Sequence, residues 1–82
     1  MDITFLVRVE RGDEVELWQR SVQRPYPGIP RSGDSIFLGD EAYDMPAVVA
    51  DVTWENNGGI TLSIDLPPSF APALERVRFE RL

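Results

Sequence analysis

Carboxylates are the most plentiful chemically active groups in this chain. Asp40, Glu41 and Asp44 lie within five residues, and Asp51 follows on a predicted strand. Hard cations such as Ca²⁺ take several oxygen ligands, so these acids are a candidate cation site. Their spacing does not match an EF-hand loop, and we prefer the interpretation that they form a solvated acidic loop. We therefore expect no metal or other cofactor.

The residue inventory restricts catalysis further. The sequence contains no Cys, His or Lys, which excludes Ser–His–Asp and Cys–His chemistry and a Schiff-base lysine. Hydrolysis by two carboxylates needs a cleft that holds both acids in different environments, and so short a chain of strands rarely builds one. Gly58-Gly59 precedes a predicted strand without a Lys, so it is no phosphate loop. We expect a non-catalytic protein with no small-molecule substrate.

The charge is unevenly distributed along the chain. The net charge is −6, which disfavours nucleic-acid binding because phosphate recognition needs clustered cations. Residues 32–75 contain eight acids and no Arg, whereas all eight Arg lie in residues 8–31 and 76–81. Solubility explains this acidic block. Alternatively, the block attracts a basic partner, and the protein is then an acidic inhibitor or decoy of a cationic site.

Length and hydropathy indicate one soluble domain over residues 1–82. Met1–Glu10 lacks the basic start and apolar run of a signal peptide. No apolar stretch approaches the roughly 18 residues of a transmembrane helix, so we expect no membrane partner. The absence of Cys fits a reducing compartment, and we expect a cytoplasmic location.

Alternating apolar residues predict short strands through most of the chain. The proline-rich stretch Arg24–Asp34 is expected to be a loop. The predicted strands are Ile3–Glu10 with Ile3, Phe5, Val7 and Val9 on one face, Val15–Gln23, Ser35–Leu38, Ala47–Trp54, Ile60–Leu66, and Glu75–Leu82 with Val77 and Phe79 inward.

Side-chain parity predicts the register of the second hairpin. Pairing Trp54 with Ile60 across an Asn56-Asn57-Gly58 loop keeps both apolar faces together, with Gly58 in the left-handed conformation. Val48, Ala50, Val52 and Trp54 are then expected to face the core.

The same reasoning on the first hairpin predicts a partner-binding surface. It pairs Val9 with Val15 and Val7 with Leu17, which leaves the pairs Arg8–Glu16, Leu6–Trp18 and Thr4–Arg20 facing solvent. Leu6–Trp18 is a large apolar pair on that face, and exposed aromatic patches mark interfaces. The predicted binding residues are two anchors and three rim residues: Leu6, Trp18, Tyr26, Arg8 and Arg20.

Other interpretations of this pair stay open. The proline-rich loop, or Phe70 and Leu74, can fold over it, and a bulge near Gln19 can turn Trp18 inward. The segment Arg24–Pro30 also fits Arg-x-x-Pro-x-x-Pro and resembles a ligand for SH3 domains, although we prefer the interpretation that it is a rigid connector.

Two segments resemble SH3-like small barrels. A turn at Ser69–Leu74 precedes the predicted last strand, and Pro30–Ile36 resembles the Pro-x-x-Gly-Asp-x-hydrophobic entry into a strand. The resemblance implies an all-β barrel of five or six strands with a 3₁₀ turn before the last one, and it implies nothing about function. We expect a protein–protein interaction or adaptor module that binds another protein or itself, or alternatively a structural subunit of a larger assembly.

Overall fold

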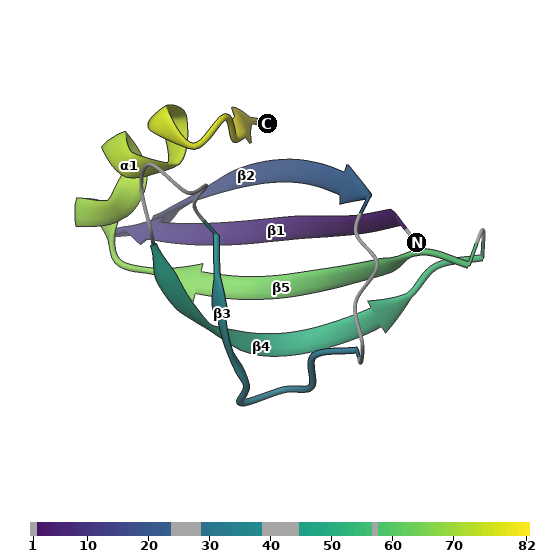
Figure 1. The fold of residues 1–82 in the computed structure, drawn as a ribbon. Helices are drawn as coiled ribbons and strands as arrows, with labels where there is room; N and C mark the ends of the chain where they lie inside the picture. Colours follow the sequence, from purple (N-terminus) through teal and green to yellow (C-terminus); the bar gives the residue numbers. More distant parts are fainter. Residues whose placement is uncertain (1, 24–28, 39–44, 57) are drawn as a thin grey trace.

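The computed structural model describes residues 2–23, 29–38, 45–56 and 58–82, which form one mixed β-sheet with a short helical segment (Figure 1). The prediction of an all-β domain is confirmed at this level. The strands are β1 (Asp2–Arg11), β2 (Glu14–Gln23), β3 (Ser35–Phe37), β4 (Pro46–Trp54), β5 (Ile60–Leu66) and β6 (Glu80–Arg81).

The strand order is β3-β4-β5-β1-β2-β6. Neighbouring strands are antiparallel except β1 and β5, which pair in parallel at the centre. The predicted barrel is not formed, because β3 and β6 are separate edges of the described sheet. The last strand, β6, pairs with β2 at Trp18 and Gln19.

One face of the sheet carries the core. The predicted inward residues of β1 are all buried, and so are their neighbours Ile60, Leu62 and Ile64 on β5. The C-terminal segment and the ends of the β3–β4 connection cover this face. The Phe5 and Phe79 rings lie 6.3 Å apart between centroids, in a tilted arrangement. Buried covering residues are Leu38, Met45, Ala71, Ala73, Leu74, Val77 and Phe79.

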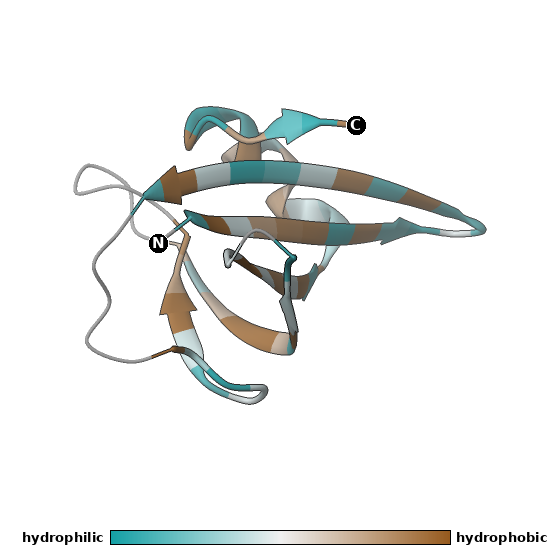
Figure 2. Cartoon of the chain, turned by 90° about the vertical axis from the view of Figure 1, so that its right-hand side faces the viewer, coloured by the Kyte–Doolittle hydropathy of each residue, from teal (hydrophilic) through white to brown (hydrophobic). Residues whose placement is uncertain are grey.

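The first hairpin adopts a register one residue away from the predicted one. Its loop is Gly12-Asp13, with Gly12 at a φ of 59°, and Val9 pairs with Glu16 instead of Val15. Alternation then turns Trp18 inward and leaves Val15 and Leu17 exposed. The alternation of polar and apolar residues along both strands is visible in Figure 2.

The second hairpin confirms the predicted register at its loop. Trp54 pairs with Ile60, and Gly58 has a φ of 86°. Farther along β4, a bulge between Val49 and Asp51 shifts the register. Ala47 and Val49 are therefore buried, whereas Val48 and Ala50, which were expected inside, are exposed.

The C-terminal segment is mostly helical. A 3₁₀ turn (η1, Pro68–Phe70) leads into helix α1 (Ala71–Arg76), so the predicted turn before the last strand is confirmed. The predicted strand over Glu75–Leu82 is reduced to Glu80–Arg81. Val77 and Phe79 are buried as expected. No helix in the described part of the chain is long and apolar enough to cross a membrane.

Candidate functional site

The predicted Leu6–Trp18 surface is not formed. Leu6 pairs with Gln19 on the outer face, and Trp18 pairs with Val7 on the core face. The Trp18 side chain is 4% exposed and lines a small cavity with Ala71 and Pro72 of α1. The two proposed anchors therefore lie on opposite faces of the sheet, and one of them belongs to the core.

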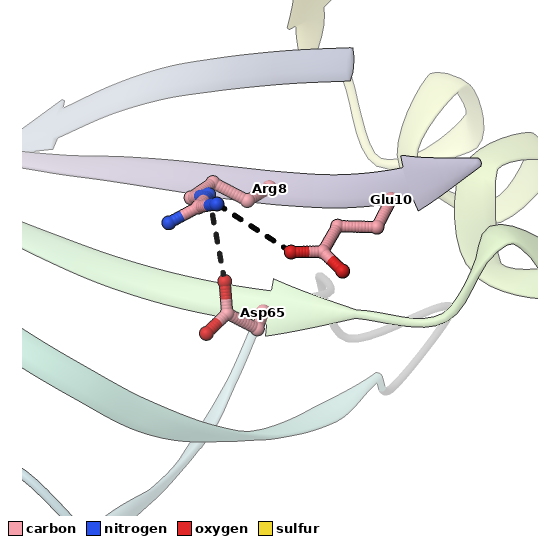
Figure 3. A network of polar contacts seen from close by, with 3 residues as sticks. All are labelled: Arg8, Glu10 and Asp65. Carbon is pink, nitrogen blue, oxygen red and sulfur yellow. Dashed lines mark hydrogen bonds and ion pairs between the residues drawn. The ribbon is translucent and has the colours of Figure 1, made fainter. Parts of the chain in front are cut away.

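The two predicted rim arginines also lie on different faces. Arg8 is on the outer face, where its guanidinium lies 3.5 Å from Glu10 Oε1 and 3.9 Å from Asp65 Oδ1 (Figure 3). Both pairs are exposed and worth about 0–1 kcal/mol. The Arg8–Asp65 pair joins the parallel strands β1 and β5, whereas Arg8 and Glu10 both lie on β1. Arg20 instead donates from Nη1 to the Val77 carbonyl at 2.8 Å. The predicted outward pairs Arg8–Glu16 and Thr4–Arg20 are wrong, because Arg8 lies opposite Leu17 and Thr4 lies opposite Ser21.

Several predicted residues lie outside the described part of the chain. Tyr26 is one of them, as are Asp40, Glu41 and Asp44 of the candidate cation site. Within the residues that the structure describes, no group of three His, Cys, Asp or Glu side chains could hold a metal ion.

Two aromatic side chains are exposed that the sequence analysis did not select. Trp54, at the end of β4, is 60% exposed, and Phe37, on β3, is 62% exposed. Phe37 lies opposite Pro46 at the sheet edge. Parity predicted that Trp54 lies on the core face of β4. Trp54 does lie on that face, because it pairs with the core-facing Ile60. However, the core at this level ends at β5: Ile60, opposite Trp54, is buried, whereas Trp54 itself is not covered. Parity gives the direction of a side chain and not whether the core reaches it.

Trp54 lines an open groove between β4 and the segment that leads into β3. The groove has a volume of about 440 Å³. Its apolar wall combines Trp54 and Val52 with Ile29 and Pro30, which are all partly or largely accessible. The polar residues of its lining are Arg31, Ser32 and Asp51.

The wall opposite β4 is fixed by hydrogen bonds. Asp34 closes a tight turn: its carboxylate accepts from the Arg31 N–H at 2.8 Å, and its N–H donates to the Arg31 carbonyl at 3.0 Å. The Ser32 hydroxyl donates to the Ala50 carbonyl at 2.8 Å, at the β4 bulge. In Figure 1 this segment is the blue trace beside the right-hand part of β4. The groove is therefore preformed.

A second polar cluster lies at the other end of the sheet. Glu16 lies 3.1 Å from Arg11 and 3.4 Å from Arg81, and its side chain is 12% exposed. Glu16 Oε2 and Trp18 Nε1 are buried, and neither has a hydrogen-bond partner among the residues that the structure describes. The cluster ties β6 and the first hairpin together, and we assign it a structural role.

Comparison with protein-family models, with curated proteins and with solved structures gives no match. The resemblance to SH3-like barrels therefore stays a prediction, and function must be inferred from the geometry alone.

Proposed function

We propose that the protein is a non-catalytic protein–protein interaction module, and that its contact site is the groove beside Trp54. The observation that carries this proposal is the 60% exposure of Trp54 on the wall of that groove. Tryptophan is enriched among residues that dominate binding energy, and such anchors pack into desolvated pockets. The exposed indole thus replaces Leu6–Trp18 as the apolar anchor.

The composition of the groove supports a protein ligand. Its lining combines apolar side chains with polar ones, and protein interfaces likewise combine apolar and polar contacts. Because the groove is held by backbone and side-chain hydrogen bonds, a ligand does not have to order it, and binding then costs less entropy. The absence of Cys supports a cytoplasmic or other reducing location.

A comparison of two single substitutions tests the proposal. Trp54→Ser removes the anchor, and Phe37→Ser removes an aromatic side chain of similar exposure outside the groove. Both variants are first checked for folding by circular dichroism and urea unfolding. Quantitative affinity capture from cell extract then compares them with the unchanged protein. A protein retained by the unchanged chain and by Phe37→Ser, but lost with Trp54→Ser, supports the groove. Equal loss with both variants indicates non-specific apolar contact and contradicts the proposal.

A further inference from the structure

The edge of β4 that faces the groove presents backbone groups that are not paired with any residue in the described part of the chain. The Glu55 N–H donates to the Gly59 carbonyl at 2.8 Å, so the backbone polar groups of Glu55 are directed toward the β5 side of β4. Backbone groups alternate in direction along a strand, so those of Val52 and Trp54 point away from β5. Among the described residues, none donates to or accepts from them on that side.

The neighbouring segment covers β4 only as far as its bulge. Gly33 donates to the Val49 carbonyl at 2.8 Å, and the Val49 N–H donates to the Asp34 carbonyl at 2.9 Å. Beyond Val49, the neighbouring segment forms the turn at Arg31–Asp34 and no longer pairs with β4, and the groove lies between the two. Val52 and Trp54 thus form a short open strand edge at the groove.

We propose that an extended segment of a partner protein binds in this groove as an additional strand, paired with Val52 and Trp54 of β4. The inference rests on the proposed function and specifies how the ligand is held. Main-chain hydrogen bonds to an exposed edge supply affinity, and alternate side chains supply specificity. An unpaired edge of this kind is a template for such pairing.

The two faces of β4 determine the chemistry of the partner segment. On one face, Val52 and Trp54 favour apolar or aromatic neighbours across the strand pair. On the other face lie Asp51, Thr53 and Glu55, where the Thr61 hydroxyl donates to Glu55 Oε1 at 2.8 Å. Opposite charges attract between paired strands, so the second set of partner side chains is basic. The segment therefore alternates apolar residues with Lys or Arg.

A second copy of this chain fits the edge less well. If two β4 edges paired about a two-fold axis, the same surface would meet itself. The row that contains Asp51 and Glu55 would then lie beside an identical acidic row, and like charges across a strand pair are destabilising. The net charge of −6 opposes this pairing further.

A peptide library provides the test. Random peptides displayed on phage are selected on the immobilised full chain and counter-selected on Trp54→Ser. We expect the enriched peptides to alternate apolar and basic residues. Hydrogen exchange by NMR should show new protection of the Val52 and Trp54 amides in the complex. N-methylation of the peptide at the pairing positions should weaken binding about tenfold or more, the loss expected for about 1.4 kcal/mol.

Charge variants test the predicted alternation. Asp51→Lys with Glu55→Lys should weaken the selected peptides about tenfold. Glu10→Lys with Glu14→Lys makes the same change of net charge on the exposed first hairpin, outside the groove, and should weaken them far less. Equal losses with both would overturn the proposed placement of the basic residues.

Four other outcomes contradict the proposal. Peptides that need Trp54, yet protect neither amide and tolerate N-methylation, would show a side-chain groove; the proposed function then stands and the pairing fails. Selected peptides that lack the alternation would also overturn the proposal. So would a library without any Trp54-dependent peptide, and the affinity capture would then decide the proposed function separately. Protection of both amides in the free protein that increases with its concentration, with a dimer in sedimentation, would identify a second copy as the occupant.

Discussion

Arg20 donates a hydrogen bond of 2.8 Å from Nη1 to the carbonyl oxygen of Val77, and this contact joins β2 to the end of α1. Carbonyl groups at a helix C-terminus lack partners within the helix and carry partial negative charge. A guanidinium is therefore a favourable donor at this position. The contact also explains why an arginine is tolerated on the core-facing side of β2.

Substitution of Arg20 should show the value of this contact. Arg20→Met keeps much of the aliphatic stem and removes the donor, so we expect the free energy of unfolding in urea to fall by about 1–2 kcal/mol. Gln19→Met, on the outer face of the same strand, is the control and should change stability by less than about 0.5 kcal/mol. Equal effects of both substitutions would show that the hydrogen bond contributes nothing specific.

Arg78 occupies a backbone conformation that favours glycine. Its φ is 66°, and it follows α1 where the Phe79 N–H donates to the Leu74 carbonyl at 3.0 Å and the Arg78 N–H donates to that of Glu75 at 3.2 Å. These bonds form a Schellman motif, whose left-handed position is usually glycine. We expect Arg78→Gly to raise the thermal midpoint, with a gain of about 0.5–1 kcal/mol. Arg78→Ala removes the same side chain and keeps the strain, so a similar gain with Ala would rule out the backbone explanation.

Glu16 should couple the two arginines that contact it. If only Arg11 or only Arg81 is changed to Gln, Glu16 keeps one cation, and each loss should be about 0–1 kcal/mol. With both changed, the largely buried carboxylate has no charged partner, and the loss should exceed the sum of the single losses. Urea unfolding of the four combinations measures this coupling. Additive losses would show that neither pair depends on the other.

The sequence patterns were sufficient for the first five strands and for the register at one hairpin loop. Alternation on β1 identified its core face, and the parity of Trp54 and Ile60 with Gly58 identified the loop. Both depend on neighbours in sequence. The parallel pairing of β1 with β5 depends on residues distant in sequence, and short-range alternation carries no information about it.

The remaining errors have local physical causes. The first hairpin has a Gly12-Asp13 loop in place of a three-residue one, and this places Glu16 and Arg20 on the core-facing side. Those charges are tolerated there because the C-terminal segment supplies Arg81 and the Val77 carbonyl as partners. The bulge at Ala50 likewise has no strong sequence signal. The groove beside Trp54 was missed because it depends on where the core ends.

The first-hairpin register predicts very different roles for Leu6 and Trp18. Trp18→Ala should reduce the free energy of unfolding by about 3–5 kcal/mol, because it leaves a cavity beneath α1. Leu6→Ala, on the half-buried outer face, should cost about 1 kcal/mol or less. Urea unfolding followed by circular dichroism measures the stability of both variants. Tryptophan fluorescence gives a second signal, because Trp54 is still present in the Trp18 variant. If Trp18→Ala were as mild as Leu6→Ala, the indole would lie outside the core, and the register with Val9 opposite Glu16 would be wrong.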